Sequence, residues 1–278
     1  MIHLIKGEFY KVYKSRAFYV CCILAAAFIV FLYGMLIMAD KIERGELANG
    51  AGGVYVSGDA MQESPLPLME QITILEILQQ MFGNCACFIT IIFAAIFVVG
   101  EYTNGAVKNA VGKGYARWKI FMAKYIAAAG VSVILLILTV ITTVLCGAAI
   151  GKGGEISGSF FQDLFLFSGI QLLLGVALNG VIVAVCELCR SLGAGITIGI
   201  AIASFSPLIT GALDMAIALV LPQSNFKISS YWVMNLITEC PVREIGGDFI
   251  IRAVLMSIVW IAVTAGAGIY HMKKADVA

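Results

Sequence analysis

The chain has 278 residues, of which 61% are hydrophobic and only 13% are charged, and its mean hydropathy is +0.97. Soluble domains carry about 25% charged residues, so this composition argues against a soluble domain and predicts a membrane protein. The formal net charge of +1 leaves no strongly basic face that would bind nucleic acid.

Residues 1–16 form a charged lead that predicts an amphipathic interfacial helix. Its apolar side chains share one helical face: Ile2, Ile5, Phe9, Val12 and Tyr13. Lys11 and Lys14 fall on the opposite face. A helix with this pattern is expected on the inner leaflet, with its basic side toward the lipid headgroups. Simple anchoring to the membrane is the alternative role for it.

Six apolar stretches follow, each long enough to cross a bilayer, which takes roughly 20 residues. Their approximate bounds are 17–38, 82–100, 126–150, 164–186, 193–213 and 249–270. The first is too long for the core of a cleaved signal peptide. Backbone polar groups in lipid must be satisfied within each segment, so all six are expected to be helices. The predicted fold is an all-α polytopic membrane protein, with a single transmembrane domain over residues 1–278.

Two segments on one side of these spans have their own character. Residues 39–81 make a first extracellular loop with the flexible stretch "GELANGAGGVYVSG", and "MEQITILEILQQM" indicates a short helix leading into the second span. Residues 214–248 are too apolar for an ordinary loop. They predict short re-entrant or interfacial helices, with Tyr231 and Trp232 as interface anchors.

Lysine and arginine set the expected orientation. Six spans put both termini on one side, and that side also holds the stretch 101–125 and the link near Arg190. Twelve of the 18 Lys and Arg residues fall on this side. Because positive residues near span ends favour the cytoplasm, we expect a multi-pass protein of the plasma membrane with both termini cytoplasmic.

The stretch 101–125, "EYTNGAVKNAVGKGYARWKIFMAKY", contains a Gly-Lys pair at residues 112 and 113. A phosphate-binding loop needs G-x-x-x-x-G-K-[ST] between a strand and a helix. Here Gly114 replaces the hydroxyl residue, the upstream Gly105 is too far from the pair, and no strand precedes it. We therefore expect no cofactor on this chain, and ATP with Mg²⁺ only on a partner subunit.

The same stretch has the features of a docking element. Residues 106–111 predict a short helix with Val107, Ala110 and Val111 on one side and Lys108 and Asn109 on the other. A short helix held under the bilayer between two rigid spans suits the transmission of force from a soluble partner. An ordinary positive loop on the cytoplasmic side is the alternative.

At this point the order of elements resembles the membrane-spanning permease subunits of type-2 ATP-binding-cassette exporters, over the whole chain. In that family a Glu ends the second span and is followed by a coupling helix with a Gly, and an Arg and a Lys lead into the third span. The matching positions here are Glu101, Gly105, Val107 to Val111, Arg117 and Lys124.

The resemblance implies a function and a set of partners. It implies a non-catalytic subunit that forms a dimer with a second permease copy or a paralogue, each docked on a cytoplasmic ATPase through the coupling loop 101–125. The residues expected to couple it to the ATPase are Glu101, Gly105, Val107, Lys108, Val111 and Arg117. The short chain and glycine-rich first outer loop resemble permeases that export or clear antimicrobial peptides.

Polar and small residues within the spans have two interpretations each. Gln171 and Asn179 lie eight residues apart, so they share roughly one helical face and could line a translocation path. Alternatively they form hydrogen bonds between helices, worth about 0.6 kcal/mol each. Gly195 and Gly199 form a G-x-x-x-G packing surface, either within the subunit or between two subunits.

The eight cysteines predict little chemistry. A disulfide from Cys240 to Cys85 or Cys87 is one alternative for the outer side. Cys186 and Cys189 form a single C-x-x-C pair, whereas a zinc site needs about four ligands. No metal site is therefore expected.

A membrane enzyme and a channel are the competing classes of function. An intramembrane protease would need a Ser–His pair, two aspartates or an H-E-x-x-H motif. His3 and His271 lie outside the spans, and Asp214 has no aspartate partner within them. The chain is thus not expected to be an enzyme, and a channel or a structural anchor without an ATPase stays the alternative.

Overall fold

The computed structural model describes the chain except for residues 44–71, 104, 153–155, 157, 221–225 and 275–278. The glycine-rich part of the first outer loop, predicted to be flexible, lies outside the described residues. Everything else is helix or short connection, and the described part of the chain contains no strand.

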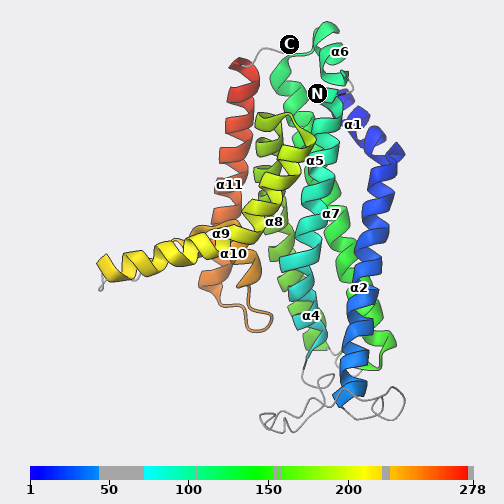
Figure 1. Cartoon of the computed structure of the whole chain (residues 1–278), viewed down its shortest axis with the longest axis vertical. Helices are drawn as coiled ribbons and strands as arrows, with labels where there is room; N and C mark the ends of the chain where they lie inside the picture. The colour runs from blue at the N-terminus through cyan, green and yellow to red at the C-terminus, as the bar shows by residue number, and fades with distance from the viewer. Residues whose placement is uncertain (44–71, 104, 153–155, 157, 221–225, 275–278) are drawn as a thin grey trace.

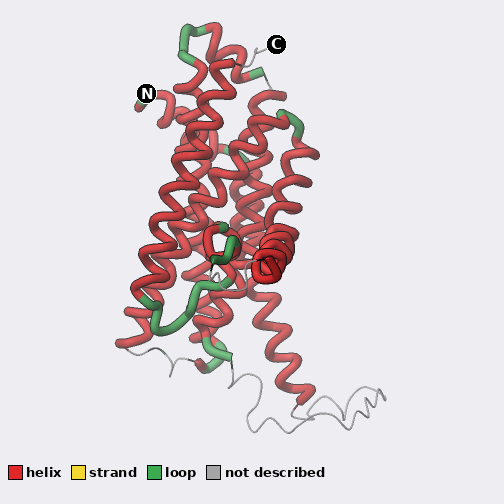
Figure 2. Tube along the Cα trace, turned by 90° about the vertical axis from the view of Figure 1, so that its left-hand side faces the viewer, coloured by secondary structure: helices red, strands yellow, loops and turns green. Residues whose placement is uncertain are grey.

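Six long helices form an elongated bundle (Figures 1 and 2), and each is long and apolar enough to cross a membrane. These are α2 (Arg16–Glu43), the continuous α4 (Ile74–Met81), η1 (Phe82–Ala86) and α5 (Cys87–Thr103), then α7 (Arg117–Ala149), α8 (Gly158–Cys189), α9 (Leu192–Val220) and α11 (Gly247–Lys274). Four short helices complete the fold of the described residues: α1 (Ile2–Lys14), α6 (Ala106–Gly112), η3 (Ser229–Tyr231) and α10 (Val233–Thr238). The all-α fold with six candidate spans is confirmed.

Several helices run past the predicted apolar stretches. The third begins at Arg117 rather than near residue 126, and the fifth continues to Val220 rather than ending near residue 213. Hydropathy marks the part of a helix that suits lipid, whereas the helix itself ends only where capping or a breaker stops it. Pro207 lies inside α9, and the half of α9 that follows it turns away from the bundle (Figures 1 and 2).

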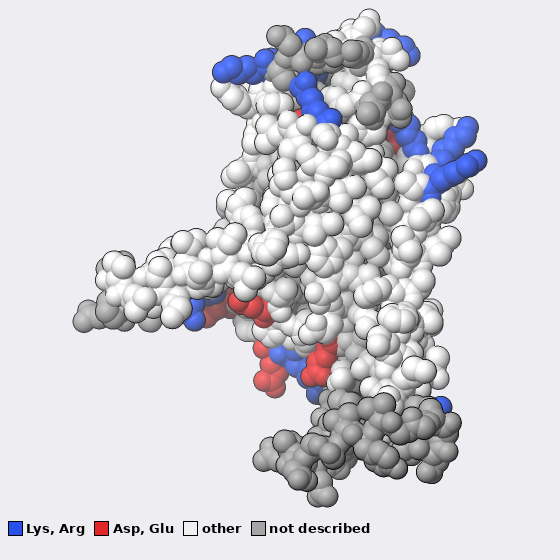
Figure 3. Space-filling model, viewed as in Figure 1, with Lys and Arg blue, Asp and Glu red and all other residues white. Residues whose placement is uncertain are grey.

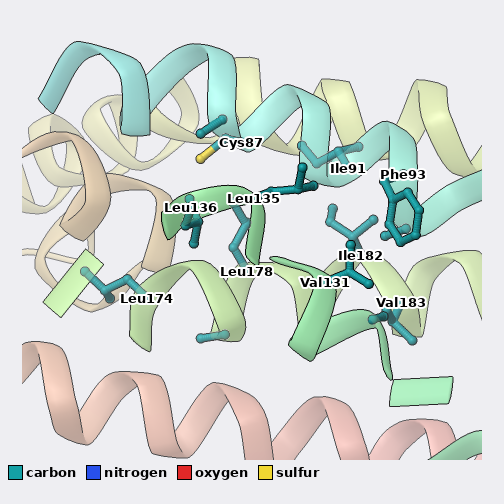
Figure 4. Close-up of a cluster of buried hydrophobic side chains, with 14 of the residues drawn as sticks. Cys87, Ile91, Phe93, Val131, Leu135, Leu136, Leu174, Leu178, Ile182 and Val183 are labelled. Atoms are coloured by element: carbon teal, nitrogen blue, oxygen red, sulfur yellow. The ribbon is translucent and has the colours of Figure 1, made fainter. Parts of the chain in front are cut away.

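The centre of the bundle is built from α5, α7 and α8 (Figure 4). Their buried apolar side chains interdigitate: Cys87, Ile91 and Phe93 from α5, Val131, Leu135 and Leu136 from α7, and Leu174, Leu178, Ile182 and Val183 from α8. Lipid tails are as apolar as these side chains, so close packing rather than escape from water holds such helices together. Helix α8 also packs against α9, α10 and α11, which makes it the central element.

Glycines allow the helices to approach closely. A Cβ atom at Gly199 would lie 2.6 Å from Ile91 Cγ2, and one at Gly195 would lie 3.0 Å from Cys186 Sγ. The G-x-x-x-G surface of α9 is therefore used within the subunit, against α5 and α8. This resolves the two alternatives that the sequence left open.

The apolar segment before α11 folds back into the bundle as η3 and α10. All residues from Val233 to Ile237 are buried. Trp232 donates its indole N–H to Ser206 at 2.7 Å and packs edge to face with Trp260. Asn235 donates to Thr210 at 2.9 Å. Short helices are thus present in this segment and cover the bundle away from α6. Their re-entrant or interfacial position in the membrane stays a prediction.

Charged side chains are unevenly distributed. We call the end of the bundle that bears α1, α6 and the last turn of α11 the α6 end (Figure 1). On the face shown in Figure 3, Lys and Arg side chains gather at the α6 end, and a broad uncharged band separates them from a mixed group near the opposite end. An uncharged band between two charged ends is the surface expected of a protein that crosses a bilayer.

Candidate functional site

The short helix α6 is the centre of the candidate site. Gly105 precedes it with φ +65°, and Gly114 follows it with φ +84°, both in the left-handed region that favours glycine. These two turns let the chain leave α5, form α6 and return into α7. Val107 is buried and anchors α6, whereas Val111 is half-buried and Asn109 is exposed. Helix α6 thus lies where the sequence predicts one, with Val107 as its buried side chain among the described ones.

The predicted coupling residues separate into two groups. Glu101 lies in the last turn of α5 with a largely buried side chain, and Arg117 begins α7 and is half-buried. Gly105, Val107 and Val111 shape and seat α6 as described above. Lys108 belongs to α6, but its side chain is outside the described part of the structure.

Glu101 joins three helices through ion pairs. Its carboxylate lies 3.2 Å from Lys124 Nζ on α7 and 2.7 Å from Lys11 Nζ on α1. Lys11 also lies 2.7 Å from Glu8, one turn earlier on α1. Only 1% of the Lys124 side chain is exposed, against 48% for Lys11. The pair of Glu101 and Lys124 is therefore a buried ion pair, and Lys11 closes it toward solvent.

Tyr102 extends the site to α8 and α11. Its ring lies 4.5 Å from Lys124 Nζ and 5.5 Å from Arg190 Cζ, so two cations face one aromatic ring. Its hydroxyl donates to Glu187 and lies 3.5 Å from Met272 Sδ on α11. The side chain of the residue after Glu101 thus contacts the ends of two other spans.

Together these side chains form one charge network at the α6 end. It consists of Glu8, Lys11, Glu101, Tyr102, Lys124, Glu187 and Arg190. Three carboxylates and three cations balance, which is the condition under which buried charges are tolerated. The network connects α1, α5, α7 and α8, and α6 follows directly on its α5 residues, Glu101 and Tyr102.

Burial and hydrogen bonding shift the pKa values of Glu8 and Lys11, the ion pair within α1. Burial raises the pKa of the Glu8 carboxyl above its ordinary 4.5, and the hydrogen bond from Lys11 only partly offsets this. For Lys11 burial lowers the pKa, but hydrogen bonds to Glu101 and Glu8 outweigh it, and the net shift is upward from 10.5. The charged form of Lys11 is thus held by the carboxylates, whereas the charged form of Glu8 is costly.

Helix α1 packs on the bundle through a few side chains. Glu8 and Val12, one turn apart, are the side chains it buries, and Phe9 packs onto Gly130 of α7. Ile2 and Tyr13, which belong to the predicted apolar face, lie exposed on the surface of the subunit. The placement of this face on the inner leaflet stays a prediction. Lys11, expected to face lipid headgroups, pairs inward with the network.

A cavity of about 350 Å³ opens beside the network, between α1, α2, α5 and α6. Phe93, Ile96 and Phe97 form its apolar wall, and Lys11 and Glu101 lie at its polar side. The exposed part of the network is therefore reached through this cavity.

The two polar residues of the fourth span lie inside the subunit. Gln171 is buried and donates its Nε2 to the carbonyl oxygen of Ile237 on α10 at 2.9 Å. Asn179 is also buried, and its Nδ2 has no hydrogen-bond partner among the described residues. Gln171 thus connects α8 to α10, as the helix-contact interpretation expects.

The cysteines are free thiols. All eight are unpaired, including Cys85, Cys87 and Cys240, so the disulfide alternative is not realised in this structure. Burial raises the pKa of Cys240 to about 12, so its thiol is protonated and unreactive at neutral pH.

Sequence reasoning missed the role of Tyr102 and the inward partners of Lys11. The structure places Glu187 and Arg190, at the end of α8, both against Tyr102. The sequence feature that could have indicated these contacts is the cluster of charged residues at the inner ends of several predicted spans.

Comparison with known proteins agrees with this architecture. The chain matches the family model described as "ABC-2 family transporter protein" over residues 2–277. No curated protein matches it. The match covers nearly the whole chain, and six helices long and apolar enough to cross a membrane accompany it. The chain therefore belongs to the ABC-2 family of transporter proteins, the membrane permease components of ATP-binding-cassette transporters.

Proposed function

We propose that this chain is the permease subunit of an ATP-binding-cassette exporter. It moves an amphipathic or lipophilic substrate, such as an antimicrobial peptide, out of the cell or the membrane. The energy comes from a separate cytoplasmic ATPase, which carries the ATP and Mg²⁺ sites. Two permeases, identical or paralogous, form the membrane part. The α6 end faces the cytoplasm, as the excess of Lys and Arg there favours.

The observation that supports this proposal most is the seating of α6. This helix projects at the positively charged end, and its attachment lies directly on the charge network that joins α1, α5, α7 and α8. A push on α6 therefore acts on four helices at once. An ordinary connecting loop has no need for such a base.

The membrane path itself is part of the same proposal. Lining this path is one of the two interpretations of Gln171 and Asn179, and both side chains are buried within the single subunit. A rearrangement that frees the bond between Gln171 and Ile237 would release α10 from α8. We propose that the path forms on such a movement.

The proposal is tested by purifying the tagged protein from its native membranes in mild detergent. Mass spectrometry identifies the partners, and ATP hydrolysis of the preparation is measured. A stoichiometric ATPase with nucleotide-binding motifs is the expected result. If the chain is recovered alone or only self-associated, with no ATPase activity, a channel or a structural anchor becomes the better account.

A further inference from the structure

Tyr102 occupies a special position between α6 and the rest of the bundle. Its carbonyl oxygen accepts the backbone N–H of Gly105 at 3.2 Å, and Gly105 is the residue that starts α6. Its side chain contacts Glu187 and Arg190 at the end of α8. One residue thus holds the start of α6 through its backbone and the end of α8 through its side chain.

Arg190 has an unusual backbone at the turn between α8 and α9. Its φ is +49°, in the left-handed region where glycine is the unstrained residue. Its N–H closes α8 by donating to the Cys186 carbonyl at 3.0 Å, and only Ser191 separates it from α9. A glycine would fit this turn with less strain. What glycine lacks is the guanidinium group that lies over the Tyr102 ring.

The contact between Tyr102 and α8 is also well buried. Glu187 is 1% exposed, and its second carboxylate oxygen has no hydrogen-bond partner in the described part of the chain. The tyrosine hydroxyl is therefore an important partner of this carboxylate, and losing it would leave a buried charge poorly solvated. Such a contact resists separation, so the end of α5 and the end of α8 are expected to move as one unit.

We propose that Tyr102, Glu187 and Arg190 form a mechanical joint, the Tyr102 joint, which carries a displacement of α6 to the turn between α8 and α9. Tyr102 and Arg190 act as positioning residues: they touch neither ATP nor the transported molecule. Through this joint the fourth and fifth spans follow the coupling helix, while Met272, 3.5 Å from the tyrosine hydroxyl, brings the end of α11 into the same unit. This inference rests on the proposed function, because it needs an ATPase that moves α6.

Two variants distinguish residues that transmit movement from residues that only close the end of α8. Tyr102→Phe keeps the ring beside its two cations and removes the hydroxyl group, with its bond to Glu187 and its contact with Met272. Arg190→Gly removes the guanidinium group and relieves the left-handed backbone. If Arg190 served only to close α8, Arg190→Gly would preserve or raise the thermal midpoint and leave every response to ATP unchanged. Arg190→Lys restores a cation near the ring and serves as the rescue variant.

The test is hydrogen–deuterium exchange of the permease–ATPase complex in lipid nanodiscs, with and without ATP and vanadate. In the unmodified complex we expect a nucleotide-dependent change in residues 105–114 and in residues 186–195. Tyr102→Phe and Arg190→Gly should keep the first change and lose more than half of the second. Arg190→Lys should recover part of it. Tyr270→Phe, on the exposed surface of α11 near the same end, is the matched control and should respond like the unmodified complex.

Each of the other outcomes would contradict the proposed Tyr102 joint, for a different reason. If both variants keep the full change at 186–195, or if the unmodified complex changes at 105–114 alone, the joint does not transmit the movement. If the variants lose both changes together with a lower thermal midpoint, the role of these residues is structural. If no ATPase is recovered, or residues 105–114 do not respond at all, the proposed function fails and the joint fails with it.

Discussion

Lys124 is a lysine with a 1% exposed side chain inside a helical bundle. Such a charge persists only because Glu101 lies 3.2 Å away and the face of Tyr102 lies 4.5 Å away. Removing one partner of a buried ion pair leaves the other charge uncompensated, which costs more than the pair contributes. At the scale of single residues, this sensitivity is the main property of the charge network.

Lys124→Met should therefore destabilise the folded protein by about 3 kcal/mol. The double variant Lys124→Met with Glu101→Gln should recover most of this loss, because no buried charge is then unpaired. Denaturant unfolding of the purified proteins in detergent measures the stability of the single and the double variant. Lys113→Met, at an exposed position, is the control and should change little. Equal losses in the single and double variants would mean that the ion pair is not what Lys124 contributes.

Glu8 gives a pH-dependent prediction. Its pKa is raised in the folded protein because the carboxyl is buried. The contribution of Glu8 to stability is therefore fully present below the pKa of the unfolded chain, about 4.3. This contribution is lost as the pH rises through the pKa of the folded protein. Glu8→Gln, which stays neutral, should thus be as stable as the natural protein in acid and at least as stable at pH 7. The thermal midpoints of Glu8→Gln and of the natural protein, measured from acid to pH 7, test this prediction. A large loss of stability in Glu8→Gln at neutral pH would show that the charged pair with Lys11 dominates instead.

At the scale of elements, close contacts fix how the helices pack. A Cβ atom on Gly268 of α11 would lie 2.0 Å from Cζ of Phe121, a fully buried side chain of α7. Nothing lies within 4 Å of a Cβ atom on Gly266, two residues earlier on α11. The two glycines look alike in the sequence, and only the packing distinguishes them.

Gly268→Ala should accordingly destabilise the protein by about 1–3 kcal/mol, because the new methyl group displaces the Phe121 ring. Gly266→Ala is the matched control, and its higher helix propensity makes it neutral or slightly stabilising. Denaturant unfolding of the two variants side by side is the measurement. Equal stabilities would mean that α11 packs on α7 differently from the structure described here.

The segment from η3 to α10 is held by hydrogen bonds that reach it from other helices. Gln79 donates to the carbonyls of Thr238 and Cys240, and Gln171 donates to that of Ile237. Gln171→Leu removes one of these bonds, at a cost of about 1 kcal/mol. Backbone amides of residues 233–238 should therefore exchange several-fold faster in hydrogen exchange. Gln80→Leu, an exposed neighbour on α4, should leave that exchange unchanged.

The sequence predicts the elements better than their contacts. Apolar stretches of about 20 residues place six spans, and the glycines around residues 105–114 place a short helix between two of them. The inward face of α1 and the role of Tyr102 follow from neither rule. Both depend on partners about 90 residues away, such as Glu101 for Lys11 and Glu187 for Tyr102, and a one-dimensional pattern does not contain such pairs.

At the scale of the whole molecule, we propose that the exposed side of α6 is where an ATPase docks. Val111 is the suitable residue to alter, because it is half-buried on α6 and outside the charge network, whereas Val107 is fully buried and its loss would disturb the fold. His3, exposed on α1 at the same end of the bundle and outside the charge network, provides a position for an equal change of charge elsewhere.

The measurement that tests this claim most directly is the amount of ATPase recovered with the tagged permease, and its activity, in Val111→Asp and His3→Asp. We predict that Val111→Asp lowers the recovered ATPase activity at least tenfold while its thermal midpoint stays near that of the natural protein. His3→Asp should keep both the recovered activity and the thermal midpoint. Full recovery of an active ATPase with Val111→Asp would contradict the docking role of α6. The stretch between Glu101 and Tyr125 would then be a positively charged loop and no more.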